Sequence, residues 1–228
     1  MNVFQYTNQG CRDINQDYCS YKIINDDKSV FVVADGMGGY SFGEIASVVV
    51  ANSIIEYVSE HYSEKTEKML TDAMQFANDS LMIKRLGLGC QRMGAVVVVA
   101  YIDEGNVTFA WLGDSRGYVI RNGKEFYHTE DHSMLNEIRQ QRQVTMSDIE
   151  LYSSMVTRSI MGTDSTDNVS TSSIRLQPFD QVLLCSDGLY KESNVLLLPQ
   201  YEETLTQHLD GLKYKMSDNY SLIRVTIQ

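Results

Sequence analysis

Two segments of the chain share one design, in which an apolar strand ends in an aspartate followed by a glycine. Residues 31–36 read Phe-Val-Val-Ala-Asp-Gly, and residues 182–188 read Val-Leu-Leu-Cys-Ser-Asp-Gly. A short, continuous apolar run of this kind predicts a buried strand. The fold must therefore place two buried strands so that each carries a carboxylate, Asp35 or Asp187, at its end.

The rest of the sequence predicts an α+β fold, in which blocks of strands alternate with helices. Strands are predicted at 3–6, 17–24, 29–34, 95–102, 107–112, 116–121, 170–176, 181–185 and 220–227. Helices are predicted at 41–62, at 66–86, within 130–158, where a short helix precedes a mobile loop, and within 200–212. Glu44 follows Ser41 by three residues and suggests a capping box at the first helix. We expect the first two helices to cover one face of a sheet.

Turn signals predict how several strands connect. Asn-Asp-Asp at 25–27 separates two strands and indicates a hairpin. The runs at 95–102, 107–112 and 116–121 are separated by Asp-Glu-Gly-Asn and by Gly-Asp-Ser-Arg-Gly. Short turns between consecutive strands are typical of antiparallel pairing. We therefore expect these three runs to form an antiparallel meander.

Composition bounds the domain count. The chain has 228 residues, of which 43% are apolar, enough for one substantial core. With two prolines and no Gly/Ser-rich block, nothing marks a linker between domains. We expect residues 1–228 to form a single domain and the protein to be a monomer.

Charge and cysteine usage exclude several kinds of partner. The formal net charge of −11 argues against nonspecific binding to nucleic acid or to anionic membranes. The longest apolar runs, such as 95–100, are far too short to span a bilayer. Four cysteines lack zinc spacing, and the chain begins without a signal peptide. We therefore expect reduced thiols and a cytoplasmic location, with no nucleic-acid or membrane partner.

Four aspartates are candidates for a metal site. Asp35 and Asp187 end strands, Asp114 lies in a turn between two strands, and Asp218 directly precedes the last strand. Converging carboxylates repel one another unless divalent cations compensate the charge, and oxygen ligands favour Mg²⁺ or Mn²⁺ over zinc. The Gly36 carbonyl could ligate beside Asp35, because glycine lets the backbone approach a ligand. Each aspartate alone is also an ordinary turn former.

As a set, these residues resemble the metal-dependent protein serine/threonine phosphatases of the type 2C family. The matching motifs, which run in order along nearly the entire chain, are at 12–17, 34–39, 112–117, 131–133, 157–159, 186–189 and 218–219. The resemblance implies a four-layer αββα sandwich, with two mainly antiparallel sheets packed face to face between helix pairs. It also implies a binuclear metal site at one edge of the sandwich.

The resemblance implies a role for each candidate. Asp35 would bridge two Mn²⁺ or Mg²⁺ ions, the Gly36 carbonyl would ligate one of them, and Asp187 and Asp218 would complete the other. Asp114 would join Asp187 around a weaker third ion. A hydroxide between the two ions would then attack phosphorus in line.

Two further residues, Arg12 and Asp17, receive roles from the same resemblance. Arg12 would bind the phosphate through its planar guanidinium, and Asp17 would orient metal-bound water. Arg12 could equally be a surface ion-pair residue. The expected substrates are phosphorylated proteins, including a Ser/Thr kinase or its targets, whose phosphorylation this enzyme would reverse.

The chain departs from the family pattern at three places. Ala95 stands where a threonine is common, Met37 stands where many eukaryotic members have histidine, and Lys-Met-Ser at 215–217 replaces a frequent Gly-Gly. Met37 is usual among bacterial members. His132 is read as a structural residue and is left out of the site.

Other activities are less consistent with the sequence. No cysteine is followed by arginine six positions later, Asp35 lacks a second aspartate two residues on, and no P-loop occurs. Cysteine-dependent phosphatases, dehalogenase-type phosphatases and kinases are thereby disfavoured. The remaining alternative is a catalytically impaired phosphatase-like module that binds phosphoproteins or a signalling partner, which the loss of the threonine at 95 would suit.

Overall fold

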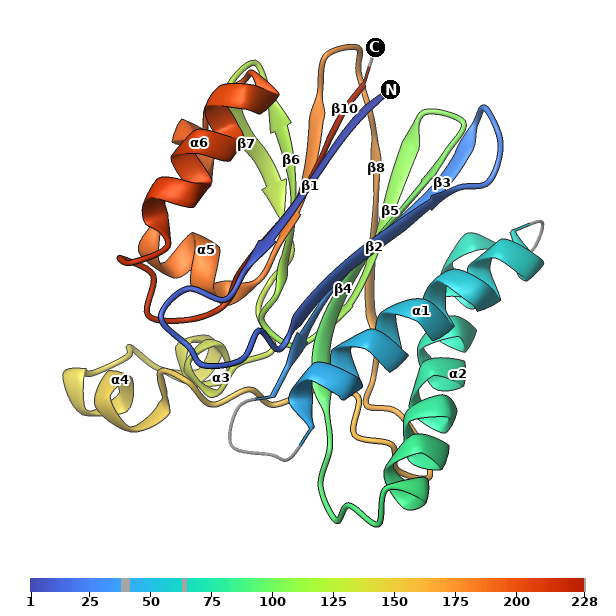
Figure 1. Cartoon of the computed structure of the whole chain (residues 1–228), viewed down its shortest axis with the longest axis vertical. Coiled ribbons are helices and arrows are strands. Elements are labelled where there is room, and N and C mark those ends of the chain that lie inside the picture. Colours follow the sequence, from blue (N-terminus) through green and yellow to red (C-terminus); the bar gives the residue numbers. More distant parts are fainter. Residues whose placement is uncertain (38–41, 63–64, 228) are drawn as a thin grey trace.

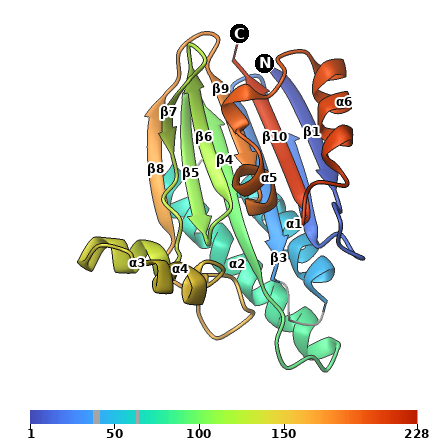
Figure 2. The ribbon, with the colours of Figure 1, turned by 90° about the vertical axis from the view of Figure 1, so that its left-hand side faces the viewer.

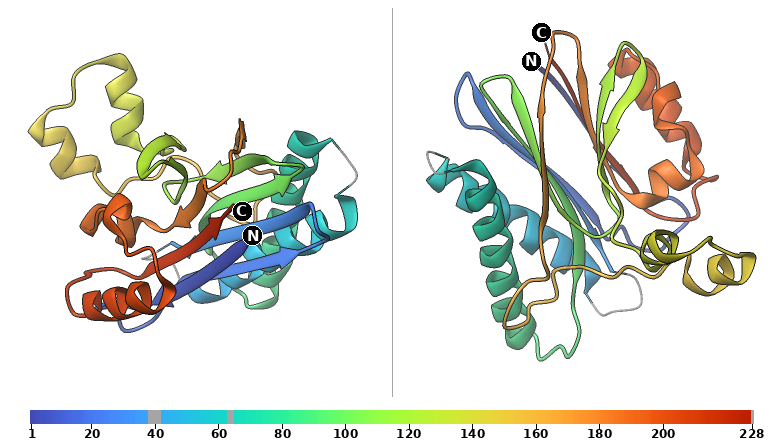
Figure 3. Two further views of the ribbon diagram at one scale, coloured as in Figure 1. Left: turned by 90° about the horizontal axis from the view of Figure 1, so that it is seen from above. Right: turned by 180° about the vertical axis from the view of Figure 1, so that it is seen from behind.

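The computed structural model describes residues 1–37, 42–62 and 65–227. Two five-stranded antiparallel sheets pack face to face, and helices cover both outer faces (Figures 1 and 3). The first sheet has the order β1 (Asn2–Asn8), β10 (Tyr220–Thr226), β9 (Gln181–Cys185), β6 (Arg116–Arg121), β7 (Lys124–His128). The second has the order β2 (Asp17–Ile23), β3 (Lys28–Gly36), β4 (Ala95–Asp103), β5 (Asn106–Leu112), β8 (Ser170–Arg175). The predicted αββα sandwich is confirmed.

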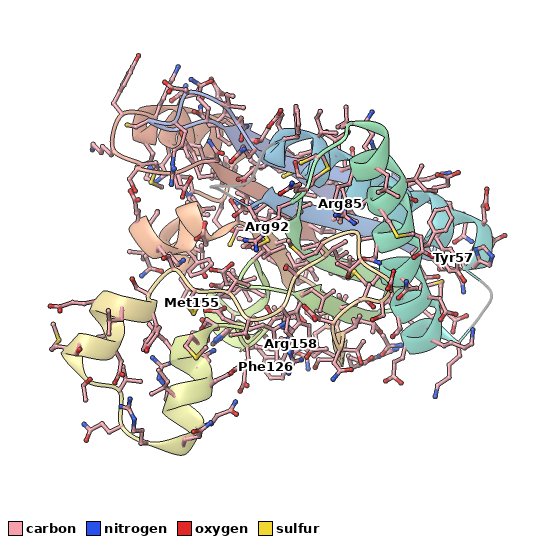
Figure 4. The ribbon with its side chains drawn as sticks, turned by 90° about the horizontal axis from the view of Figure 1, so that it is seen from below. Tyr57, Arg85, Arg92, Phe126, Met155 and Arg158 are labelled. Atoms are coloured by element: carbon pink, nitrogen blue, oxygen red, sulfur yellow. The ribbon has the colours of Figure 1, made fainter. Side chains whose placement is uncertain are left out.

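Each sheet carries its own helices. The long pair α1 (Gly43–His61) and α2 (Thr66–Gly87) packs on the second sheet through a core of buried Val, Ala, Ile, Leu and Met side chains, as predicted. On the first sheet lie α5 (Asp187–Glu192), the 3-10 turn η1 (Val195–Leu197) and α6 (Glu202–Leu212) (Figure 2). The short helices α3 (Met134–Gln141) and α4 (Met146–Tyr152) project from one end of the sandwich (Figures 1, 2 and 4).

The start of α1 differs from the expected one. The helix begins at Gly43, and its N-cap is Phe42, which has a left-handed backbone (φ 65°) and makes no side-chain capping bond. Ser41 of the predicted capping box lies outside the described residues, as do Gly38 and Gly39 of the motif before it. The predicted hairpin at 25–27 is present, since β2 and β3 pair antiparallel on either side of it. The Asn25 side chain stabilises the turn by accepting hydrogen bonds from the backbone amides of residues 27 and 28.

The predicted three-stranded meander is wrong. β4 and β5 pair as expected, but β6 pairs with β7 and β9 in the other sheet. The chain crosses between the sheets at Gly113, whose φ of 112° disfavours any other residue. A Cβ at Gly113 would also clash with the side chain of Val96. This crossing sets Asp114 at the junction between the two sheets.

Two elements were missed between 121 and 158. β7 follows a tight Asn122-Gly123 turn in which both residues have positive φ, the conformation that such hairpin turns require. The mobile loop predicted after α3 is instead helix α4. Thr145 and Asp148 form a full capping box at its start, so a sequence signal for this helix was present and was overlooked.

The structure bears on two expectations from the sequence, the state of the cysteines and the presence of membrane-spanning segments. All four cysteines are free, and Cys19 and Cys185 are buried. Among the described residues, no helix combines the length and the apolar character needed to cross a bilayer.

Candidate active site

A cavity of about 560 Å³ opens at the end of the sandwich where β3 and β9 finish. Six predicted site residues line it: Arg12, Asp35, Gly36, Asp114, Asp187 and Asp218. The structure thus brings residues from five separate parts of the sequence to one place. Asp17, the seventh, lies buried at the start of β2 beside Asp35.

Strand alternation explains why two carboxylates meet here. Cys19, Phe31 and Val33 point into the core between the two sheets. Side chains two residues apart on a strand point the same way, so Asp17 and Asp35 continue these rows at the open end of the core. The two residues are also direct partners in the β2–β3 pairing. Like charges in such positions repel each other, so the fold forms against an electrostatic cost.

Asp17 is only partly satisfied by the protein. The Ser186 hydroxyl donates a hydrogen bond to Asp17 Oδ2 at 2.6 Å. Asp17 Oδ1 is buried and has no partner among the described residues. Burial, with smaller contributions from the charges of Asp187 and Asp218, raises the pKa of Asp17 to about 7, against the lowering effect of the hydrogen bond from Ser186. A buried, unpartnered carboxylate oxygen points to a missing donor at this site.

Asp35 is the centre of the charge cluster. It is the second-last residue of β3, is half-buried, and lines the cavity. Burial first, and then repulsion from Asp17, Asp187, Asp114 and Asp218, hold the pKa of Asp35 well above its usual value. A carboxyl group in a cavity whose pKa is raised by burial and by neighbouring charges is typical of a functional site.

The neighbour of Asp35, Gly36, fits only as glycine. A Cβ at this position would clash with the backbone of Gly43 at the start of α1. Its amide donates to the Gln16 carbonyl at 3.0 Å, and it pairs across the sheet with Ala95. The close approach of α1 therefore fixes the backbone beside Asp35.

The turn that carries Asp114 is held by His132. The Gly113 amide donates to His132 Nδ1 at 3.2 Å, and the Gly113 carbonyl accepts from the His132 amide at 2.9 Å. His132 also stacks on Trp111, and burial lowers the pKa of its ring to about 4, so that it is neutral. The histidine lies outside the residues that line the cavity and positions the turn, in agreement with the structural reading.

Lys191 is a site residue that sequence reasoning missed. Its ammonium donates to Asp187 Oδ2 at 2.6 Å and to Asp114 Oδ2 at 3.2 Å. Burial raises the pKa of Asp114 to about 6, with a contribution from Asp187, while Lys191 opposes the shift. The spacing of Asp187 and Lys191 is i,i+4, the spacing of ion pairs on a helix. That signal was available, but helix α5 was not predicted.

Arg12 is paired with Asp218, the predicted ligand on the last loop. Arg12 Nη2 lies 2.8 Å from Asp218 Oδ2, and both side chains are substantially exposed. An exposed pair of this kind is worth only about 0–1 kcal/mol, so an incoming anion could compete for the guanidinium.

Gly10, with φ of 58°, lies so close to the Asp218 carbonyl that a Cβ would clash with it.

The Lys-Met-Ser segment at 215–217 does not draw Asp218 away from the cavity. Met216 is buried, and its carbonyl accepts from the Cys11 amide at 3.0 Å. Ser217 is held through its backbone amide by Glu192. The loop is therefore packed between the turn at Cys11 and the end of α5.

The other two departures lie close to Asp35. Ala95 is fully buried and exchanges two backbone hydrogen bonds with Ile160. Ala95 pairs directly with Gly36, and its side chain lies in the core under α1 and α2, on the face of the sheet opposite to Asp35. Met37 lines the cavity and brings no proton to it.

The donor set suits hard divalent cations. Carboxylate and carbonyl oxygens are the preferred ligands of Mg²⁺ and Mn²⁺, and the unpartnered Asp17 Oδ1 together with the crowded charge on Asp35 calls for a positive species. Within the described part of the chain, no three His, Cys, Asp or Glu side chains stand close enough to share one ion. Lys191 contacts the carboxylates of Asp114 and Asp187 instead, and Arg12 contacts that of Asp218. The residues fit the ions in charge and donor type, and the ions would have to compete with these two cations.

Comparisons with known proteins agree with the resemblance. The family model described as protein phosphatase 2C matches residues 8–219. The serine/threonine phosphatase stp of Listeria monocytogenes is 29% identical over 201 residues, which cover 85% of this chain and 78% of that protein.

Solved structures share the fold. The S. agalactiae serine/threonine phosphatase superposes with a TM-score of 0.83 at 26% identity, covering 100% of this chain and 99% of that one. The catalytic domain of the phosphatase PstP, solved in complex with two manganese ions, superposes with a TM-score of 0.81 at 20% identity, covering 100% and 98%. Because the family model matches most of its length, this chain belongs to the protein phosphatase 2C family.

Proposed function

We propose that this chain hydrolyses phosphoserine and phosphothreonine in proteins, with two Mn²⁺ or Mg²⁺ ions, and so reverses the action of a Ser/Thr kinase. The observation that carries the proposal is the convergence of Arg12 with the carboxylates of Asp35, Asp187 and Asp218 around one cavity. Family membership supports it. We also propose that residues 1–228 act as one catalytic domain.

The acidic residues would hold the ions. Asp35 would bridge the pair, the Gly36 carbonyl would ligate one ion, and Asp187 and Asp218 would ligate the other. Ions in such a site supply a water that loses its proton near neutral pH and positive charge that offsets the phosphoryl oxygens. Asp114, the predicted ligand of a third ion, already contacts the ammonium of Lys191.

The chain's own groups would position the reactants. Asp17 Oδ1, buried and unpartnered, would accept a hydrogen bond from the attacking water and hold it in line with phosphorus. Arg12 would donate two parallel hydrogen bonds to phosphoryl oxygens, at little cost because its pair with Asp218 is exposed. The water would give up one proton to solvent as its oxygen joins phosphorus, the ester P–O bond would break, and the serine or threonine oxygen would leave with a proton taken from solvent.

The proposal is tested by hydrolysis of a phosphothreonine peptide in Mn²⁺, in Mg²⁺ and in chelator. Asp35→Asn and Asp187→Asn should lose nearly all turnover. Asp26→Asn is a matched control, because it removes one charge from the exposed β2–β3 hairpin. Circular dichroism would confirm equal folding of all variants.

Metal-dependent turnover that disappears in both site variants would support the hydrolase. A folded wild-type chain that is silent in every metal would contradict it and would favour the phosphoprotein-binding module. Ala95→Thr would then be the first change to make, since it would place a hydroxyl beside Gly36.

A further inference from the structure

Lys191 occupies a place that two carboxylates would otherwise offer to a divalent ion. Its Nζ lies 2.6 Å from Asp187 Oδ2 and 3.2 Å from Asp114 Oδ2. Asp114 is buried, and Asp187 is only 21% exposed in its side chain. Two such carboxylates in one partly desolvated place need a cation between them, and here the chain supplies its own.

Neighbouring contacts fix the position of this ammonium. Lys191 follows Asp187 by one turn of α5, so both side chains lie on the same face of the helix. The adjacent Tyr190 hydroxyl donates to the Asp114 backbone carbonyl at 2.9 Å. The guanidinium of Arg116 stacks on the Tyr190 ring at 3.8 Å. Helix α5 and the Asp114 turn are therefore joined at two points, and Lys191 is one of them.

We propose that Lys191 acts as a built-in cation that excludes a third divalent ion from the Asp114–Asp187 pair and leaves a two-ion site. The inference rests on the proposed metal site. It differs from the expectation drawn from the family resemblance, in which Asp114 joins Asp187 around a third ion. In this chain the same two oxygens already hold an ammonium.

Geometry and charge both oppose a third ion beside Lys191. An Mg²⁺ or Mn²⁺ ligated by Asp114 would lie about 2.1 Å from its oxygen. Since that oxygen is 3.2 Å from Nζ, the ion would lie no more than about 5 Å from the ammonium. Two cations at that separation repel strongly in a partly buried place. Asp187 can still ligate one of the two proposed ions through Oδ1, because Lys191 contacts the other oxygen, Oδ2.

The test counts Mn²⁺ ions per chain at saturation, using the electron paramagnetic resonance signal of free Mn²⁺ during titration. Lys191→Gln removes the charge and keeps much of the length of the side chain. We expect this variant to bind one more ion per chain than wild type, and we expect the gain to disappear in Lys191→Gln/Asp114→Asn. Lys191→Arg keeps the charge and should show the wild-type count.

The control is Lys124→Gln, a charge removal at the exposed start of β7, which should leave the count unchanged. Equal counts for wild type and Lys191→Gln would overturn the proposal, as would a gained ion that survives loss of Asp114. A wild-type chain that binds no Mn²⁺ would refute the proposed two-ion site, while the difference between wild type and Lys191→Gln would still decide the role of Lys191.

Discussion

Replacing Asp17 by asparagine should stabilise the metal-free protein. The change removes one charge from the cluster, and the amide oxygen can still accept the hydrogen bond from Ser186. The new amide nitrogen would stand where Asp17 Oδ1 has no partner, beside the crowded carboxylate of Asp35. If removal of the Asp17 charge stabilises the metal-free protein, the carboxylates of the cluster repel one another in the folded state.

The size of the effect follows from the pKa of Asp17. The folded protein raises this pKa from 3.8 to about 7, so the folded state retains a proton that the unfolded chain releases. Stability therefore falls as pH rises from about 4 through about 7, and the full cost applies above that. About three pKa units at about 1.4 kcal/mol each give an upper value of about 4 kcal/mol at pH 8. Structural relaxation and water entry around the charged Asp17 lower this electrostatic cost. We therefore expect Asp17→Asn to raise the free energy of unfolding by about 2 kcal/mol or more.

The assay is urea unfolding in chelator at pH 8 and at pH 4, for wild type, Asp17→Asn and the hairpin control Asp26→Asn. A gain of about 2 kcal/mol corresponds to a rise in Tm of about 4–8 °C for a chain of this size. The gain should be close to zero at pH 4, where Asp17 is protonated in the folded state. Saturating Mn²⁺ should stabilise wild type more than Asp17→Asn, because ions that bind only the native state add to its stability.

The reasoning would be refuted by an Asp17→Asn variant that is no more stable than wild type in chelator at pH 8. A gain of the same size at pH 4 would also refute it, since the effect would then be unrelated to charge. An equal gain in Asp26→Asn would show that net charge, rather than the cluster, is responsible.

Three further changes have defined outcomes. Gly113→Ala should lower the free energy of unfolding by about 2–5 kcal/mol in urea melts, because φ is 112° and the new Cβ would clash with Val96. Thr145→Ala should cost about 1 kcal/mol of local stability in α4, seen as faster hydrogen exchange, since it removes the capping box. Arg12→Lys should raise the KM for a phosphopeptide while Tm stays nearly constant, because lysine lacks the planar fork and the pair with Asp218 is exposed.

Local patterns predicted most of the elements, because apolar runs and turn residues act over a few positions. The strand β3, which carries Asp35 next to its last residue, the strand β9, which ends two residues before Asp187, and the helix pair α1 and α2 needed no information from distant parts of the chain. The site residues were found as a set through motifs that match a family. A motif match predicts which residues belong to the site, but it does not predict which other residues they contact.

Long-range pairing could not be predicted in the same way. A Gly-Asp turn between two strands looks alike in sequence whether the second strand joins the same sheet or the facing one, so β6 was placed wrongly. Lys191 was missed for a related reason. Its partnership with Asp187 is local, but its contact with Asp114 depends on how α5 docks against the β5–β6 turn.

The central claim is that the carboxylates at the end of the sandwich hold a pair of divalent ions. Anomalous diffraction at the manganese edge, from crystals grown with Mn²⁺, tests it most directly. The account predicts two anomalous peaks in the cavity, both within ligand distance of the Asp35 carboxylate, and the loss of both in Asp35→Asn. A fully ordered cavity with no anomalous peak at saturating Mn²⁺, or with peaks remote from Asp35, would contradict it.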